Sequence, residues 1–254
     1  MLSFLPLLML AAQAPDAVVR HYVRSNRDGS SAEKIVHFRP TRTDVAVYKW
    51  VSKCETAAYV TAQMDPSTWE PRGLDAGKVA ADGTQARFGR LDLDPATRTV
   101  SAWADLPPGR VSDTAVVPAG MPWFLFDYDL GDLNAYLQET RPTGDFTFAF
   151  ALVWPESEDF LTHMASVHAA HRGIALRDGR SVRRFDLHFV AGRKGSGTLW
   201  TEPATGAIVE AEASVPNHPG MADFRLKLQR EEPGGAAAWN ALLEGHYAQC
   251  GERG

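Results

Sequence analysis

Apolar and polar residues alternate along much of this chain, and the pattern predicts a protein built mainly from β-strands. The clearest stretch is 185–228, where Phe185, Leu187 and Phe189 are separated by polar residues. A period of two is typical of a strand with one buried face. Turn residues divide the stretch into an antiparallel meander, at 192–197, 203–206 and 216–220.

The same pattern recurs in the rest of the chain. Strands are expected at 18–24, 35–38, 44–54, 56–64, 77–80, 87–94, 99–104 and 145–154. Turn signals about every ten residues favour a sheet over alternating strands and helices. The Pro- and Gly-punctuated connection at 107–122 is the one internal boundary that the pattern offers. We therefore predict a single β-rich domain over 15–254, with any weak division falling in that connection.

Two segments predict helices, and one is ambiguous. Trp239, Leu242 and Leu243 begin an apolar stripe that reaches Cys250 at helical spacing. A short helix is expected over 132–140, with Asp132 as its N-cap. Residues 156–173 fit either a helix or a strand, and we favour a strand because a meander surrounds them. The predicted fold is a large curved antiparallel sheet, a half-barrel or open barrel, with an amphipathic C-terminal helix over part of its concave side.

The first fourteen residues resemble an export signal. Residues 2–10 are apolar, and Ala12-Gln13-Ala14 has the form of a cleavage site. Two features depart from the usual signal: no Lys or Arg precedes the apolar run, and Pro15 would follow the cut. The run is too short to span a bilayer. We expect removal of residues 1–14 and a periplasmic or secreted mature protein that does not span the membrane.

The overall charge limits the classes of partner. The net charge is −5 and the isoelectric point is about 5.9. Nucleic acids and anionic membrane surfaces attract proteins with a basic surface. Neither is therefore expected as the main partner.

The chain has two cysteines, Cys54 on a predicted strand and Cys250 at the end of the predicted helix. Exported proteins form disulfides readily, so we predict a Cys54–Cys250 bridge. Two separate buried thiols are the alternative. No C-x-x-C motif points to redox chemistry.

No familiar catalytic or metal-binding motif is present. His163, His168 and His171 form a local group, but H-E-x-x-H is missing and no acidic or thiol ligand lies at a familiar spacing. Asp127 and Asp129 do not match a calcium loop. There is no G-x-S-x-G, P-loop or dinucleotide-binding pattern. We predict no metal and no cofactor.

Aromatic residues are abundant on the predicted strands. Core packing explains most of them, but a curved sheet with an aromatic inner face also forms apolar cavities. The candidate ligand contacts are aromatic residues expected on the concave side: Tyr48, Trp50, Phe146, Phe148, Phe150 and Trp200.

The hairpin at 197–209 reads G-x-L-W-x-x-P-x-T-G-x-I-V. A strand-rich exported chain with this hairpin resembles periplasmic lipoprotein carriers of the LolA/LolB type over about 145–228. The chain departs from that pattern by lacking a lipobox cysteine and by having about a hundred additional residues before the matching part. The resemblance implies an open half-barrel that holds an acyl chain or an apolar peptide.

Three functions remain open from the sequence. The first is a non-catalytic periplasmic protein that binds a lipid-like or apolar ligand, or an envelope partner. The second is an envelope structural or assembly factor without a small ligand. The third is a hydrolase that uses Asp127, Asp129 or the histidine group.

Overall fold

The computed structural model describes residues 17–248 and 250. The strands of this part form one fifteen-stranded sheet in the order β8-β7-β6-β5-β4-β3-β2-β1-β15-β14-β13-β12-β11-β10-β9. Neighbouring strands are antiparallel throughout, except that β9 runs parallel to β10. The expected large antiparallel sheet is confirmed. The predicted signal segment lies outside the described residues.

The strands lie within the following bounds: β1 Val18–Ser25, β2 Glu33–Phe38, β3 Asp44–Trp50, β4 Ala58–Met64, β5 Pro71–Val79, β6 Gln85–Asp94, β7 Thr99–Leu106, β8 Gly109–Val116, β9 Trp123–Leu125, β10 Phe146–Val153, β11 Leu161–Arg177, β12 Arg180–Gly192, β13 Ser196–Thr201, β14 Ile208–Ala213 and β15 Phe224–Pro233. The helices are the 3-10 helix η1 at Phe126–Tyr128, α1 at Gly131–Thr140 and α2 at Gly235–Glu244.

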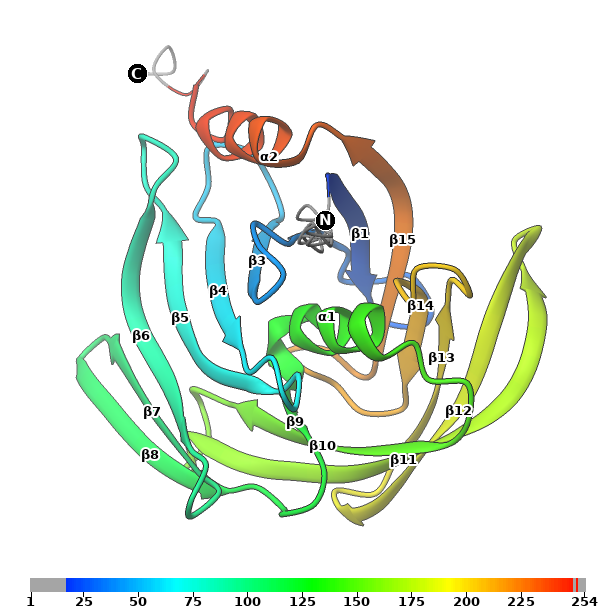
Figure 1. The fold of residues 1–254 in the computed structure, drawn as a ribbon. Helices are drawn as coiled ribbons and strands as arrows, with labels where there is room; N and C mark the ends of the chain where they lie inside the picture. The colour runs from blue at the N-terminus through cyan, green and yellow to red at the C-terminus, as the bar shows by residue number, and fades with distance from the viewer. Residues whose placement is uncertain (1–16, 249, 251–254) are drawn as a thin grey trace, which may run out of the picture.

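The sheet curls around α1, which lies inside its curve (Figure 1). We call the face toward α1 the inner face. Leu133 and Leu137 of α1 join the main core with inner-face residues of most strands. The 203–206 turn closes on the end of the helix at Gly206, whose φ is +78°. A Cβ there would lie 2.1 Å from the Leu137 carbonyl oxygen, so this contact requires glycine.

The terminal helix lies on the other face of the sheet, which corrects the expectation that it covers the concave side. Val45 and Val47 of β3 belong to the inner core, whereas Ala46 and Tyr48 belong to a second core beneath α2. Successive residues of a strand point to opposite faces, so α1 and α2 cover opposite faces of the same strands. Trp239 of α2 stacks on Phe38, with ring centroids 5.4 Å apart.

Two further segments bear on the sequence predictions: one corrects an expected connection, and the other settles an ambiguous assignment. Residues 107–122, expected as a connection, contain strand β8. The ambiguous segment 156–173 lies mostly in β11, the longest strand, as favoured from the sequence.

The curl brings β8 at one end of the sheet against β11. The Leu161 amide donates a hydrogen bond to the Asp113 carboxylate across this contact, at 3.0 Å. At the other end, β9 is buried in the core. The sheet is therefore an open curl rather than a closed barrel.

Candidate functional site

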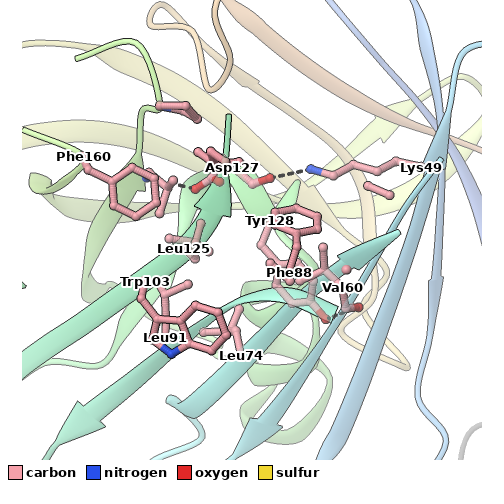
Figure 2. A pocket seen from close by; sticks show the side chains of 17 residues that line it. Lys49, Val60, Leu74, Phe88, Leu91, Trp103, Leu125, Asp127, Tyr128 and Phe160 are labelled. Atoms are coloured by element: carbon pink, nitrogen blue, oxygen red, sulfur yellow. Dashed lines mark hydrogen bonds between the residues drawn. The ribbon is translucent and has the colours of Figure 1, made fainter. Parts of the chain in front are cut away.

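An apolar cavity of about 170 Å³ lies on the inner face of β4 to β7. Figure 2 shows Val60, Leu74 and Leu91 from these strands on one side, with Leu125, Tyr128 and Phe160 also bordering it. The cavity is smaller than a drug-sized site, which usually occupies 300–1,000 Å³. It is comparable with an engineered apolar cavity of about 150 Å³ that binds benzene.

The position of α1 explains why space remains here. The helix fills the inner face beside β3, where Gly131 of α1 packs against Val47. Farther along the sheet, the inner face carries small residues, among them Ala58, Ala76 and Ala104. Small side chains leave the volume between the strands and Phe160 incompletely filled.

One end of the cavity is polar, and Lys49 organises it. The Lys49 ammonium donates to the Asp127 carbonyl oxygen at 2.7 Å and to Oδ2 of Asp129 at 2.9 Å. Nε2 of His218 lies 3.4 Å away as a third acceptor. An ammonium group has three N–H donors, so these contacts occupy all of them.

Asp129 is the fully buried partner of Lys49. Asn217 donates to its Oδ1 at 2.8 Å, and Nη1 of Arg24 lies 3.5 Å from the same oxygen. Burial alone raises the pKa of a carboxyl group, but Lys49 and Arg24 outweigh that effect and hold the pKa of Asp129 below its usual value. Asp129 therefore stays ionised and neutralises Lys49.

Asp127 borders the cavity and is less well paired. Its Oδ1 accepts a hydrogen bond from the Val153 amide at 3.2 Å. Burial raises the pKa of this carboxyl to about 6, although Lys49 partly opposes the shift. Its own backbone amide also interacts with the carboxylate, and no other described residue donates a hydrogen bond to its second oxygen, Oδ2.

Asp132 lies behind this cluster and does not cap α1 as expected. The N-cap is Leu130, and Asp132 sits in the first turn of the helix. Its Oδ2 accepts the Leu125 amide at 2.7 Å, and its Oδ1 accepts the Leu133 amide at 2.8 Å. Burial raises its pKa to about 7, and the charge of Asp127 adds to the shift. Its role is to hold the β9–α1 connection together.

The six aromatic residues predicted as ligand contacts lie in three places, and none of them borders this cavity. Phe148 and Phe150 are buried in the inner core, where Phe148 contacts Phe124 and Phe150 contacts Phe126. Phe146 is partly buried beside them. A role in ligand binding for these three stays a prediction.

The other three aromatic residues point to the outer face. Tyr48 and Trp50 stack on each other beneath α2, with ring centroids 4.2 Å apart. Trp200 lies under the Arg177 guanidinium at 4.4 Å. Strand alternation places them there, because their neighbours Val47 and Leu199 face the inner core.

The predicted disulfide is present. Cys54 and Cys250 are bonded, with their Cα atoms 5.5 Å apart. Beside the bridge, the Tyr48 hydroxyl meets Nδ1 of His246 at 2.5 Å, and Nε2 of that histidine contacts the Glu55 carbonyl oxygen at 2.7 Å. These contacts fix the segment after α2 to the β3–β4 loop.

The histidine group does not converge on the cavity. His168 contacts Asp145 at 3.3 Å and stacks on His188. His163 contacts Ser166. Within 17–248 and 250, no three His, Cys, Asp or Glu side chains are arranged to hold a metal ion, and no helix there is long and apolar enough to cross a bilayer.

Sequence reasoning missed Lys49, although the alternation contained a signal for it. Lys49 is two residues from Val47, so it points to the same inner face. A cation on a buried face needs an acidic partner, and Asp127 and Asp129 had already been singled out as carboxylates. Lys49 and Asp129 lie about eighty residues apart in the sequence, so their pairing is visible only in the folded structure.

Comparisons with known proteins give a loose likeness of fold. No protein-family model and no curated protein matches the sequence. A β-barrel-like protein from Brucella abortus, of the domain of unknown function DUF1849, matches with a TM-score of 0.43 and 10% identity over 88% of this chain and 99% of that one.

A second similar structure is an outer membrane lipoprotein-sorting protein domain from Vibrio parahaemolyticus. It has a TM-score of 0.23 and 11% identity, over 89% of this chain and 91% of that one. Both TM-scores lie below 0.5, so neither likeness says what this chain binds.

Proposed function

We propose that this protein is an exported, non-catalytic binding protein for a small apolar ligand or for the apolar end of a lipid-like molecule. The supporting observation is the cavity on the inner face of β4 to β7, lined mainly by aliphatic and aromatic side chains. A compact apolar group entering it leaves water without losing hydrogen bonds.

The expected affinity is modest. Burial contributes about 0.8 kcal/mol for each CH₂ group. An alkyl chain of about eight carbons gains roughly 6 kcal/mol, and association costs offset part of that gain. Dissociation constants in the high micromolar to millimolar range follow for a simple alkyl ligand.

Export is supported by the disulfide between Cys54 and Cys250. Such bonds persist in oxidising compartments and are rare in the cytosol. The signal-like sequence at 1–14 also supports export. A periplasmic location places the cavity within reach of envelope lipids.

Calorimetric titration with 1-octanol tests the binding function. We expect binding with a negative heat-capacity change, the mark of apolar burial. Ala76→Phe fills the cavity from β5 and is expected to weaken binding at least about tenfold, since the new ring occupies the space that the ligand needs.

Ala86→Phe is the matched control, because Ala86 is exposed on β6 and does not border the cavity. Binding by this variant should equal that of the wild type. Absence of binding by the wild type, or equal binding by folded Ala76→Phe, would refute the proposal and favour an envelope assembly factor without a small ligand.

A further inference from the structure

The polar end of the cavity includes Oδ2 of Asp127, a carboxylate oxygen to which no other described residue donates a hydrogen bond. Lys49 and Asp127 are the charged side chains at the cavity. The three donors of Lys49 are taken by Asp127, Asp129 and His218. The Tyr128 hydroxyl donates to the Val45 carbonyl oxygen at 2.9 Å. Of the two charged side chains at the cavity, Asp127 thus has a carboxylate oxygen, Oδ2, that can accept a hydrogen bond from a ligand.

The charges around this end do not cancel. Asp129 balances Lys49 at 2.9 Å, and Glu33 pairs with Arg24. Within 17–248 and 250, no ion pair joins the Asp127 carboxylate to a cation of its own. With its carboxyl ionised, these five side chains carry two positive and three negative charges, and buried Asp132 behind them supplies no positive charge, so this polar end keeps at least one net negative charge.

We infer that the ligand of this cavity is an amphiphile with a protonated amine head and a short apolar body, bound with its nitrogen on Asp127. The inference rests on the proposed function and adds the chemical class of the head group. An ammonium head donates to Oδ2 and supplies the missing positive charge, and such charge-assisted hydrogen bonds are the strong ones. A carboxylate head would meet Asp127 as a like charge in a site of low dielectric.

The test compares three eight-carbon ligands by calorimetry at pH 8: octylamine, 1-octanol and octanoate, each below its micelle concentration. Asp127, with a pKa of about 6, is ionised at that pH, while an alkylamine is protonated. We expect octylamine to bind at least about tenfold more tightly than octanoate, with 1-octanol between them.

Asp127→Asn removes the charge and keeps an oxygen for the Val153 amide. We expect the ratio of octylamine affinity to octanoate affinity to fall to within about threefold of unity in this variant. Asp178→Asn is the control for net charge, because Asp178 is an exposed carboxylate on the β11–β12 turn, paired with Lys227 at 2.6 Å. It should keep the wild-type ratio.

The outcomes separate this inference from the proposed function. If octanoate binds the wild type as tightly as octylamine does, the amine head is refuted and apolar binding stands. If none of the three ligands binds, the proposed function itself fails. The wild-type comparison decides both points even if Asp127→Asn does not fold. A ratio that survives in folded Asp127→Asn would refute Asp127 as the contact.

Discussion

Three aspartates within six residues have different protonation behaviour because their partners differ. Asp129 faces Lys49 and Arg24 and has a lowered pKa. Asp127 is only partly compensated, and its pKa is raised to about 6. Asp132 has backbone amides as partners and a pKa of about 7. The net charge of this region therefore depends on pH near neutrality.

Asp132→Asn tests the raised pKa through stability. A carboxyl that binds its proton more tightly in the folded state makes the free energy of unfolding rise as the pH falls below about 7. From pH 8 to pH 5, this contribution of Asp132 is roughly 2 to 3 kcal/mol in the wild type. The variant lacks this contribution. The free energy of unfolding of the wild type minus that of the variant should therefore be larger at pH 5 than at pH 8 by that amount.

Urea denaturation of both proteins at pH 8 and pH 5 measures this difference. Comparison with the variant cancels other titrating groups, including buried His37, whose lowered pKa of about 3 acts in the opposite direction. For Asp178→Asn, the stability difference from the wild type should change little between pH 8 and pH 5, because Asp178 has a lowered pKa and titrates below this range. A difference that is constant with pH would mean that Asp132 stays ionised.

At the scale of elements, the position of α1 depends on one close approach. A Cβ at Gly131 would lie 2.5 Å from Cγ2 of Val47 and 3.2 Å from Cε1 of Tyr128. Val47 is β-branched and fully buried, so it has little freedom to move. Glycine thus sets the distance between the helix and β3, and the cavity begins beyond the region that the helix fills.

Gly131→Ala should lower the free energy of unfolding by about 1 to 3 kcal/mol. A loss of stability would point to the close contact, because helix propensity alone favours alanine over glycine by about 1 kcal/mol. In a Val47→Ala background the clashing methyl group is gone, and the same substitution should cost less than half as much. A double-mutant cycle by urea denaturation measures this coupling.

Gly144→Ala is the control, because a Cβ there would meet no atom within 4 Å. Its effect should stay within about 0.5 kcal/mol. Additive effects of Gly131→Ala and Val47→Ala would show that the helix does not rest on this contact.

Strand alternation made most elements predictable, but it did not assign their faces. The pattern at 185–228 predicted β12 to β15 because each strand there has one apolar face. Tyr48 and Trp50 were expected on the concave side because aromatic residues suggest a core. Both faces of β3 are buried, one under each helix, and alternation alone does not distinguish two buried faces.

The candidate site was harder to predict, for a geometric reason. A cavity is the volume that neighbouring side chains fail to fill, and this one depends on where α1 begins. Its charged residues, Lys49 and Asp127, are far apart in the sequence and meet only when η1 packs against β3. The disulfide was predictable because only one pairing of two cysteines exists.

At the scale of the whole molecule, the strand order has one long-range step. β1 pairs with β15, and every other pair of neighbours in the sheet is consecutive in sequence. The two strands that do not pair with each other although consecutive are β8 and β9, at the two ends of the sheet. The first and the last strand of the described chain therefore meet in the middle of the sheet.

In circular order every pair of neighbouring strands is consecutive, and each pair is antiparallel except β9 and β10. A permuted chain that begins at Gly120, with residue 250 joined to residue 17 through a flexible linker, would run from β9 to β15 and then from β1 to β8. Every pair of neighbouring strands would then be consecutive in sequence. Closing the β1–β15 contact would then fix a much shorter loop, and refolding should be up to roughly tenfold faster. A permuted chain that begins at Asp82 makes β5 and β6 the distant pair, so it should refold at about the natural rate. Stopped-flow refolding of the three chains measures this rate. Equal rates would show that the β1–β15 pairing does not limit how fast the sheet forms.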